Sequence, residues 1–244
     1  ADDGDGNTHT SQAESLASSV EIIFPQFMVN RIYVDAYKKI SQASGLTIPD
    51  GSNHFLELLD MGLLMVNYTG HGSTTEWAEE KILTQRMAKE MVNSCLPLWV
   101  TATCDFTRYD APDESGGETV FLNPRGGAIA LFTTTRIVYS SNNFVLNQRF
   151  TDNIFSRRNG KRNTLGEIMY LTKRSDVMRN DRNKLSFALI GDPAMKLAYP
   201  EYAVKVTHVN GKPVSTAIDT FQALQTVTVE GEVYAEDGRF AETF

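Results

Sequence analysis

The sequence predicts an α/β fold, in which a parallel sheet is covered by helices on both faces, followed by the first strands of an all-β domain. Apolar, β-branched runs alternate with amphipathic segments of helical spacing, as expected where helices connect parallel strands. Each run is apolar along nearly its whole length, which is typical of strands buried on both faces. Beyond residue 200 the pattern changes to alternating polar and apolar residues. We therefore expect an α/β domain over residues 1–200 and the beginning of a β-sandwich over 201–244.

The first half of the chain is predicted to alternate helices and strands. Ser11 and Glu14 have the spacing of a capping box, which predicts the start of the first helix. Pro49 at one end and Gly62 at the other mark the second helix. The remaining segments follow from helical periodicity and from apolar runs. The predicted helices cover 11–24, 49–62 and 80–93, and the predicted strands cover 30–37, 63–69 and 96–103.

The second half repeats the alternation and then changes character. The basic stretch "RRNGKR" (157–162) is interpreted as a solvated loop between two helices. Asn210-Gly211 is typical of the turn of a β-hairpin, and an alternating run follows over 224–238. The other predicted elements are a short helix over 116–123, a strand over 126–135, helices near 140–156 and 163–178, and a closing segment over 184–200.

Composition excludes some functions. The 244 residues carry a net charge of −7, with a pI near 5.2, whereas nucleic-acid binding needs clustered Lys and Arg, so we expect no nucleic-acid partner. No run approaches the ~20 apolar residues of a membrane span. The sequence starts at "ADDGDG" without an initiator Met, so we expect a piece of a longer protein, and the missing targeting signal carries little information.

The two cysteines, Cys95 and Cys104, are predicted to be unpaired. The run between them reads as a buried strand of seven or eight residues, which would span roughly 23–26 Å. A disulfide needs Cα atoms within about 7 Å of each other. Cys104 is therefore expected to be a free thiol.

Two reactive side chains follow directly after predicted strands. His71 comes just past the end of the 63–69 strand, and Cys104 just past the end of the 96–103 strand. With one helix between them, these strands are natural neighbours, and ligands of such sheets bind beyond the carboxyl ends of the strands. An imidazole can take the proton of a nearby thiol and so activate it as a nucleophile. The spacing therefore predicts a His71/Cys104 catalytic dyad.

Small residues around the dyad are expected to hold the substrate. Gly70 and Gly72 on either side of His71 allow the backbone to approach a substrate carbonyl closely. The backbone N–H groups of Gly72 and Cys104 could form an oxyanion hole. The residues that we expect to line the substrate site are Gly70, Ser73, Thr103 and His9.

Three segments resemble a known family. "LLMVNYTGHGSTTEWAEE" (63–80) and "LPLWVTATCDF" (96–106) resemble the histidine and cysteine motifs of the gingipain-type cysteine peptidases, and "FALIGDPAMKL" (187–197) is similar to the segment that ends their catalytic domain. The resemblance implies a caspase-like fold, with residues 1–200 as the C-terminal part of a catalytic domain and an immunoglobulin-like module after it. It also implies that His71 is the general acid/base and Cys104 the nucleophile.

Within this family, the sequence resembles the sortase of the type IX secretion system. That resemblance implies a cysteine endopeptidase or transpeptidase on the outer membrane of a Gram-negative bacterium, which needs no cofactor. It would remove the C-terminal signal domain of cargo proteins and help to anchor the cargo to lipopolysaccharide. The implied partners are such cargo proteins, lipopolysaccharide as acyl acceptor, and other outer-membrane proteins of the secretion system.

Two alternatives stay open. The same fold could be a catalytically silent module that only recognises the signal domain, or a gingipain-like endopeptidase of other specificity. Trypsin-like members place an acidic residue in their first specificity pocket, and residues 6–15 offer no unambiguous equivalent. The resemblance puts the third catalytic carboxylate upstream of residue 1, so little activity is expected from this chain alone.

A calcium site is a weaker alternative for the start of the chain. Asp3, Asp5, Asn7 and Glu14, together with Ser11, fall at ligand positions of an EF-hand loop. The sixth position, which requires glycine for a sharp turn, is Thr8, and no helix precedes the loop. Structural calcium held by Asp3, Asp5, Asn7 and Glu14 is therefore only a secondary expectation, although gingipains do bind calcium.

Overall fold

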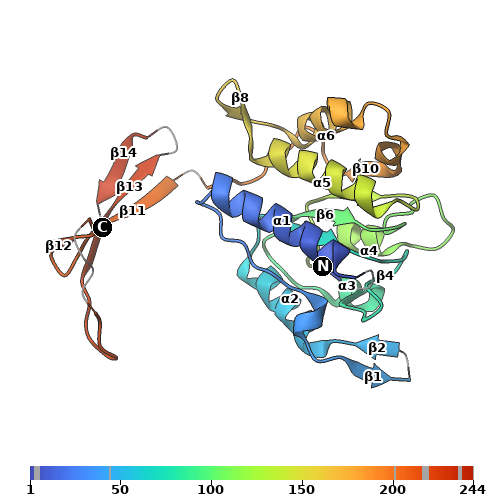
Figure 1. Ribbon diagram of the computed structural model, residues 1–244, viewed down its shortest axis with the longest axis horizontal. Helices are drawn as coiled ribbons and strands as arrows, with labels where there is room; N and C mark the ends of the chain where they lie inside the picture. Colours follow the sequence, from blue (N-terminus) through green and yellow to red (C-terminus); the bar gives the residue numbers. More distant parts are fainter. Residues whose placement is uncertain (3–5, 44, 201, 216–219, 236–237, 244) are drawn as a thin grey trace. The chain divides into compact units, whose positions relative to one another are not determined.

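A computed structural model describes residues 1–2, 6–43, 45–200, 202–215, 220–235 and 238–243 (Figure 1). The chain divides into two compact units, Ala1–Leu197 and Ala198–Phe244. Across the described residues, every helix is too short or too polar to cross a membrane.

A four-stranded sheet forms the centre of the first unit, in the order β10-β7-β6-β3. The strands β3 (Met65–Thr69), β6 (Leu98–Ala102) and β7 (Ala130–Thr134) run parallel, as predicted. The fourth strand, β10 (Phe187–Ile190), is antiparallel to β7. Two helices rather than one connect β7 to β10, so the chain returns to the sheet in the opposite direction. The fold is a mixed α/β fold with β3 as an outer strand.

Helices cover both faces of this sheet, as predicted. Every residue of β6 and β7 is buried, and neighbouring side chains point to opposite faces. On one face Trp99 packs against Phe55 of α2 (Pro49–Met61), with ring centroids 5.7 Å apart. On the other face Phe132 stacks on Phe150 of α5 (Ser140–Phe155), with centroids 3.9 Å apart. The sheet is therefore the middle layer of three.

The remaining helices belong to the two helical layers, one on each face of the sheet. The helix α1 (Thr8–Ile23) contacts α5 and β3, and α6 (Leu165–Arg174) packs on α5 (Figure 1). The short helices α3 (Gln85–Glu90) and α4 (Gly116–Leu122) contribute to the apolar cluster around Trp99. The other elements of this unit are short: β1 (Ile40–Gln42), β2 (Gly45–Thr47), β4 (Glu76–Trp77), β5 (Leu83–Thr84), η1 (Val34–Ala36), η2 (Asp176–Met178) and η3 (Arg182–Ser186).

Two predictions near the start of the chain are wrong. Ser11 and Glu14 do not form a capping box, because α1 begins earlier, after Asn7 in a left-handed conformation, and Glu14 binds Arg31 instead. Residues 30–37 form no strand and contain only the turn η1. Their backbone pairs with Ala1, whose N–H and C=O bond to Ile32 and Val34, rather than with the sheet.

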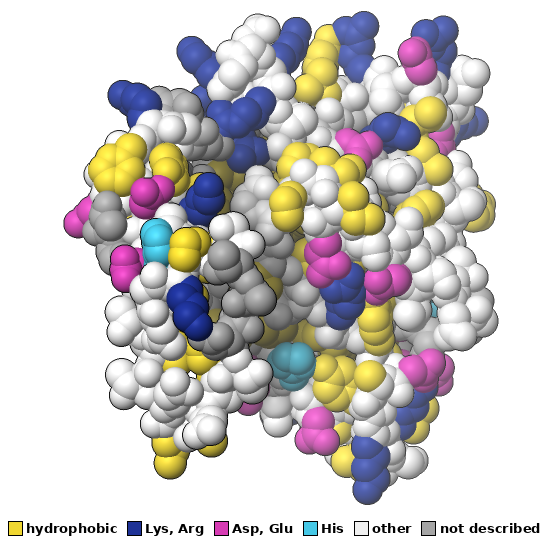
Figure 2. Space-filling model, turned by 60° about the vertical axis from the view of Figure 1, so that its left-hand side comes forward, with side chains coloured by type: hydrophobic (Ala, Val, Ile, Leu, Met, Phe, Trp, Pro, Cys, Tyr) yellow, Lys and Arg dark blue, Asp and Glu magenta, His cyan; other side chains and the backbone are white. Residues whose placement is uncertain are grey.

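Two further predictions are wrong in part. The helix expected over 80–93 is limited to α3, because Leu83–Thr84 pairs with β4 and the Thr84 side chain then caps the helix at the Met87 N–H. The basic stretch 157–162 is a hairpin, β8 (Arg157–Arg158) with β9 (Lys161–Arg162), and not a loop. In Figure 2, Lys and Arg side chains gather at the top of the molecule, which is the end where Figure 1 labels β8.

The second unit contains an antiparallel sheet in the order β12-β11-β13-β14. The predicted hairpin turn is confirmed, because Asn210 and Gly211, at φ values of 51° and 74°, connect the first two strands. The alternating run over 224–238 forms a strand over part of its length. The strands are β11 (Tyr202–Val209), β12 (Lys212–Pro213), β13 (Val229–Ala235) and β14 (Phe240–Thr243).

Candidate active site

The strands β3 and β6 bring His71 and Cys104 to one edge of the sheet. The parallel pairing ends with Thr69 opposite Ala102, and Gly70 N–H continues it with a bond of 3.5 Å to the Ala102 carbonyl. His71 and Cys104 each follow two residues after that last pair. His71 is exposed and Cys104 is partly exposed. Both side chains therefore belong to the same accessible edge, as the sequence predicts.

The backbone turns sharply at the cysteine. Asp105, the next residue, has a φ of 50°, a left-handed conformation that is uncommon outside glycine. The turn is held to the end of β7, because Thr134 donates its hydroxyl to the Thr103 carbonyl. The Cys104 thiol donates to the Val138 carbonyl at 3.7 Å. The turn therefore lifts Cys104 out of the buried strand while its neighbours stay anchored.

The predicted oxyanion hole consists of two backbone N–H groups, those of Gly72 and Cys104. Gly72 lies opposite Trp77 in an isolated antiparallel bridge. The neighbouring residues make the hydrogen bonds: Ser73 N–H donates to the Glu76 carbonyl and Ala78 N–H to the His71 carbonyl, both at 2.9 Å. In this arrangement the N–H of the bridging residue points away from its partner strand. Among the described residues, neither the Gly72 N–H nor that of Cys104 has a hydrogen-bond acceptor.

The loop that follows β3 and carries His71 (residues 70–75) lies directly against the loop that follows β6 and carries Cys104 (residues 103–106). A Cβ atom on Gly72 would come within 2.5 Å of Thr103 Oγ1 and 3.0 Å of the Glu76 carbonyl oxygen. Real Cβ atoms essentially never approach other heavy atoms to under 3.0 Å. Glycine at this position therefore allows the two loops to approach, and this close packing keeps them in register.

A buried carboxylate, which sequence reasoning missed, holds the histidine loop. Asp2 is 2% exposed, and its Oδ2 accepts the His71 backbone N–H at 2.5 Å. Tyr68 donates its hydroxyl to the His71 carbonyl at 2.6 Å and lies 3.4 Å from the same Oδ2. Burial, and next the Asp2 carboxylate, raise the pKa of Tyr68 well above its usual range, so Tyr68 remains a donor. Only its position, next to "DGDG", distinguishes Asp2 in the sequence, so no pattern could have singled it out.

Two histidines meet at this carboxylate. His9 places Nδ1 3.0 Å from Asp2 Oδ1 and is 4% exposed. Its ring lies edge-on to that of His71, with centroids 4.9 Å apart. The ligand atoms of Asp2, His9 and His71 all lie within 4.8 Å of one another. One carboxylate and two imidazoles therefore converge at the end of β3.

The structure assigns the predicted substrate-lining residues to different positions. Thr103 is 1% exposed and His9 is 4% exposed, so both side chains are buried beneath the surface at which a substrate would bind. Ser73 is exposed, and its Oγ accepts the N–H groups of Thr75 and Glu76, both at 3.2 Å. Gly70 packs against Asp2, since a Cβ atom there would lie 2.8 Å from Asp2 Cγ. Ser73 is thus the one of the four whose side chain reaches the surface.

The calcium prediction gains no support from the described residues. Asp3 and Asp5 lie outside them, and Asn7 precedes α1 in a left-handed conformation. Glu14 accepts hydrogen bonds from Arg31 at 2.9 Å and from Tyr33, and the Arg31 guanidinium in particular lowers the Glu14 pKa to about 2. Glu14 is therefore already bound by one cation and by hydroxyl groups. Calcium binding stays a prediction.

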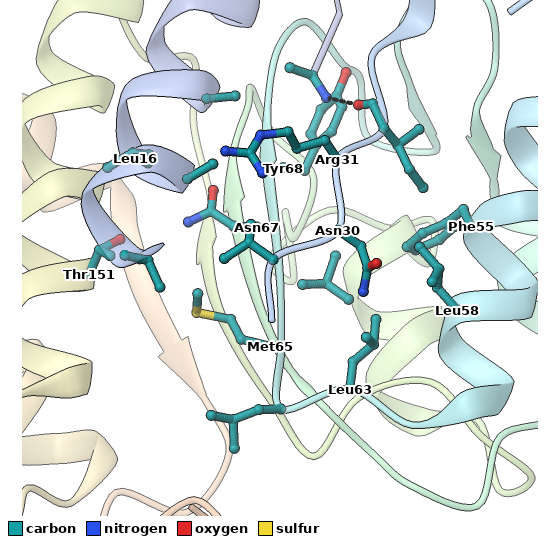
Figure 3. A pocket seen from close by; sticks show the side chains of 18 of the residues that line it. Leu16, Asn30, Arg31, Phe55, Leu58, Leu63, Met65, Asn67, Tyr68 and Thr151 are labelled. Carbon is teal, nitrogen blue, oxygen red and sulfur yellow. Dashed lines mark hydrogen bonds between the residues drawn. The ribbon is translucent and has the colours of Figure 1, made fainter. Parts of the chain in front are cut away.

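A separate cavity lies along the outer strand and not at the dyad. It has a volume of about 240 Å³ and is lined mainly by apolar side chains of α1, α2, α5, β3 and the segment 27–33. Figure 3 shows Leu16, Leu58 and Met65 around it. Neither His71 nor Cys104 contributes to its wall. The cavity is therefore separate from the sheet edge that holds His71 and Cys104.

Comparisons with known proteins agree with this architecture. The model of peptidase family C25 matches residues 1–198. The crystal structure of the Arg-specific cysteine proteinase gingipain R (RgpB) superimposes with a TM-score of 0.64 at 16% identity, covering 100% of this chain and 56% of that one. The complex of RgpB pro- and mature domains from Porphyromonas gingivalis gives a TM-score of 0.61, again at 16% identity and with the same coverage of 100% and 56%.

Dimeric latent PorU from Porphyromonas gingivalis is 29% identical over 48% of this chain and 11% of that one, with a TM-score of 0.30. Comparison with curated protein sequences gave no significant match. The chain spans about half of the gingipain chains, which share its fold.

Proposed function

Because the chain belongs to peptidase family C25, we propose that it is a cysteine endopeptidase in which Cys104 is the nucleophile and His71 the general acid/base. One observation carries this proposal. The parallel pairing of β3 with β6 leaves His71 and Cys104 at matching positions, two residues beyond the last pair. A module that only binds a partner has no need for an imidazole and a thiol at matching strand ends.

The chemistry follows from these positions. His71 takes the proton of the Cys104 thiol as the sulfur attacks the substrate carbonyl carbon. The Gly72 and Cys104 N–H groups donate to the oxyanion that forms. His71 then gives the proton to the departing amine, which breaks the peptide bond and leaves a thioester on Cys104. Water or a second amine attacks the thioester and restores the thiol.

We further propose that the whole protein acts as the sortase of a type IX secretion system at the surface of a Gram-negative bacterium. It would cleave the C-terminal signal domain from cargo proteins and pass the acyl group to an amine of lipopolysaccharide, beside other outer-membrane proteins of the system. The resemblance of the sequence to that enzyme supports this. The binding of Glu14 by Arg31 also supports it, because Glu14 is then not free to select a basic substrate side chain.

Two alternatives follow from the same fold. A gingipain-like endopeptidase of another specificity would use the same dyad on other substrates and would transfer the acyl group only to water. A silent recognition module would bind the signal domain without cleaving it. Free N–H groups at Gly72 and Cys104 favour an enzyme over the silent module, since a binding site gains nothing from an unfilled oxyanion hole.

Variants of the whole protein test these proposals. Cys104→Ala and His71→Ala should each stop the processing of cargo in cells, whereas Cys95→Ala, which removes the other thiol, should not. Undiminished processing by Cys104→Ala would refute the peptidase. Incubation of purified protein with cargo and an amine, followed by mass spectrometry, separates the two reactions. An amide-linked product indicates transfer, and a free carboxylate alone indicates hydrolysis.

A further inference from the structure

We propose that Asp2, His9 and His71 form a binding site for a divalent transition metal, in the first place Zn²⁺, and that the bound metal inhibits the enzyme by withdrawing His71 from Cys104. The existence of the site rests on the cluster alone, and its inhibitory effect rests on the proposed function. The site is distinct from the calcium loop considered above, since it uses imidazole nitrogens.

The donor set suits zinc. One carboxylate and two imidazoles, with a fourth position left for water, are a combination that Zn²⁺ binds in enzymes. Imidazole ligands disfavour Ca²⁺ and Mg²⁺, which prefer oxygen. Asp2 and His9 are 2% and 4% exposed, so they are fixed ligands rather than mobile surface groups. His71 is exposed, so its ring can rotate onto a metal.

The distances are close to those of a zinc site. Asp2 Oδ1 and His9 Nδ1 are 3.0 Å apart, and two ligands of a tetrahedral zinc ion lie about 3.3 Å from each other. All three ligand atoms lie within 4.8 Å of one another. A movement of the His71 ring by roughly 1–2 Å therefore completes the geometry, while Asp2 and His9 need little change.

The surroundings orient the carboxylate for this role. The His71 N–H and the Tyr68 hydroxyl lie on the Oδ2 side of Asp2, at 2.5 and 3.4 Å, which leaves Oδ1 directed at His9. Hydrogen bonds that fix a ligand in this way typically strengthen metal binding 10- to 100-fold. Gly70 contributes as well, because a Cβ atom there would displace the Asp2 carboxyl group.

Occupation of the site would switch off the dyad. A neutral imidazole has one nitrogen with a free lone pair and one that carries a proton, so once a metal occupies the lone pair neither nitrogen can accept the proton of a thiol. His71 therefore cannot serve Zn²⁺ and Cys104 at the same time, and the metal acts as a reversible inhibitor. Neither His9 nor Asp2 belongs to the proposed dyad, and Asp2 only positions His71, so the inhibitor site and the dyad share one residue.

Zinc binding to the 244-residue chain tests the site. Titration with Zn²⁺ against a chromophoric chelator, with Co²⁺ as a spectroscopic substitute, should give one tight site and the visible absorption of tetrahedral Co²⁺. Asp2→Asn, His9→Gln and His71→Ala should each weaken binding at least tenfold. His208→Ala, which removes a histidine outside the cluster, is the matched control and should bind as the parent does. Circular dichroism of each variant checks that it folds. His71→Ala is expected to disturb folding least, because the His71 side chain is exposed.

Two results would overturn the proposal. Equal binding by the parent and by all three variants would mean that the metal binds elsewhere. Loss of binding in Cys104→Ser with full binding in His9→Gln would mean that the metal sits on the dyad instead.

The inhibitory effect has its own readout. Zn²⁺ should slow the alkylation of Cys104 at least tenfold in the parent chain but not in His9→Gln. Equal slowing in both, or none in either, contradicts the inhibition. If Cys104 proves not to be a nucleophile in cargo processing, the binding pattern of the variants is unaffected, so failure of the proposed function and failure of the metal site are distinguishable.

Discussion

Gly72 is the residue at which packing and chemistry are most tightly linked. We expect Gly72→Ala to destabilise the chain by about 1–3 kcal/mol, because the new methyl group would overlap with Thr103 Oγ1. Thr103→Ala removes that oxygen, so the double variant should recover part of the loss and show a coupling of about 0.5–3 kcal/mol. Denaturant unfolding of the four proteins in the cycle measures this. Strictly additive effects would show that the two loops do not depend on this contact.

Asp2 is predicted to position His71 rather than to react. Asp2→Ala leaves the His71 N–H without its buried acceptor, which destabilises the native position of His71 by about 1–3 kcal/mol. Because His71 is then less often in that position, alkylation of Cys104 should slow roughly 5- to 100-fold. Asp2→Asn retains an oxygen acceptor and should restore most of the rate. Iodoacetamide labelling with mass spectrometry provides the measurement. If Asn is as slow as Ala, the negative charge of Asp2 and not its position is what matters.

The two reactive residues could be predicted from the sequence, but their supports could not. His71 and Cys104 each follow an apolar run, and strand ends of a parallel sheet meet at one edge. Asp2 and His9 support the site through hydrogen bonds and ring contacts between side chains, which no periodic pattern encodes. The sequence predicts that Thr103 and His9 face the substrate, yet both are buried, because the depth of a side chain depends on neighbours that are distant in sequence.

At the scale of elements, α1 is held to the following segment by an ion pair that depends on pH. The Glu14 pKa falls from 4.5 to about 2 in the folded chain, first because Arg31 donates to it. A carboxylate with a lowered pKa stabilises the folded state above about pH 4.5, and the contribution disappears as the pH falls towards 2. Because the Glu14 side chain is 46% exposed, solvent screening keeps the effect modest.

Glu14→Gln should therefore lower the melting temperature at pH 7, and the difference from the parent chain should vanish near pH 2. Thermal unfolding at pH 7, 4.5 and 2.5 measures it. Glu79→Gln is the matched control, because it changes an exposed carboxylate that makes no ion pair among the described residues. A Glu14→Gln difference that stays constant with pH would contradict the role of the ion pair.

Elements with their own local signals were predictable, and those shaped by distant contacts were not. The helix over Pro49–Met61 and the strands β3, β6 and β7 follow from a proline, a glycine and apolar runs. The segment 80–93 has helical periodicity, but pairing with β4 takes its first residues. Residues 30–37 have β propensity, but their backbone forms hydrogen bonds with Ala1 and not with a strand of the sheet.

At the scale of the whole molecule, the buried layer between the sheet and α5 is expected to dominate the stability of the first unit. Phe132 and Phe150 are 0% and 1% exposed and stacked on each other. Phe132→Ala should cost about 3–5 kcal/mol. The exposed Leu122 is the control, since Leu122→Ala should change stability by no more than about 0.5 kcal/mol.

Tryptophan fluorescence in denaturant follows this loss, because both tryptophans, Trp77 and Trp99, lie in the first unit. A small effect of Phe132→Ala, comparable with that of Leu122→Ala, would mean that the layer is loosely packed. The layered α/β architecture was predictable from fully apolar strands. The reversed direction of β10 was not, because a strand pattern carries no information on which way the chain returns.

The central claim, that His71 activates Cys104, is tested most directly by the relative reactivity of the two cysteines. Cys95 is exposed and Cys104 only partly so, so accessibility alone would make Cys95 react faster. Thiolates and not thiols are the nucleophiles, so a thiol that gives its proton to His71 should react first. We predict that iodoacetamide at pH 7 labels Cys104 at least tenfold faster than Cys95, and that His71→Ala reverses this order. Slower labelling of Cys104, unchanged by His71→Ala, would contradict the dyad.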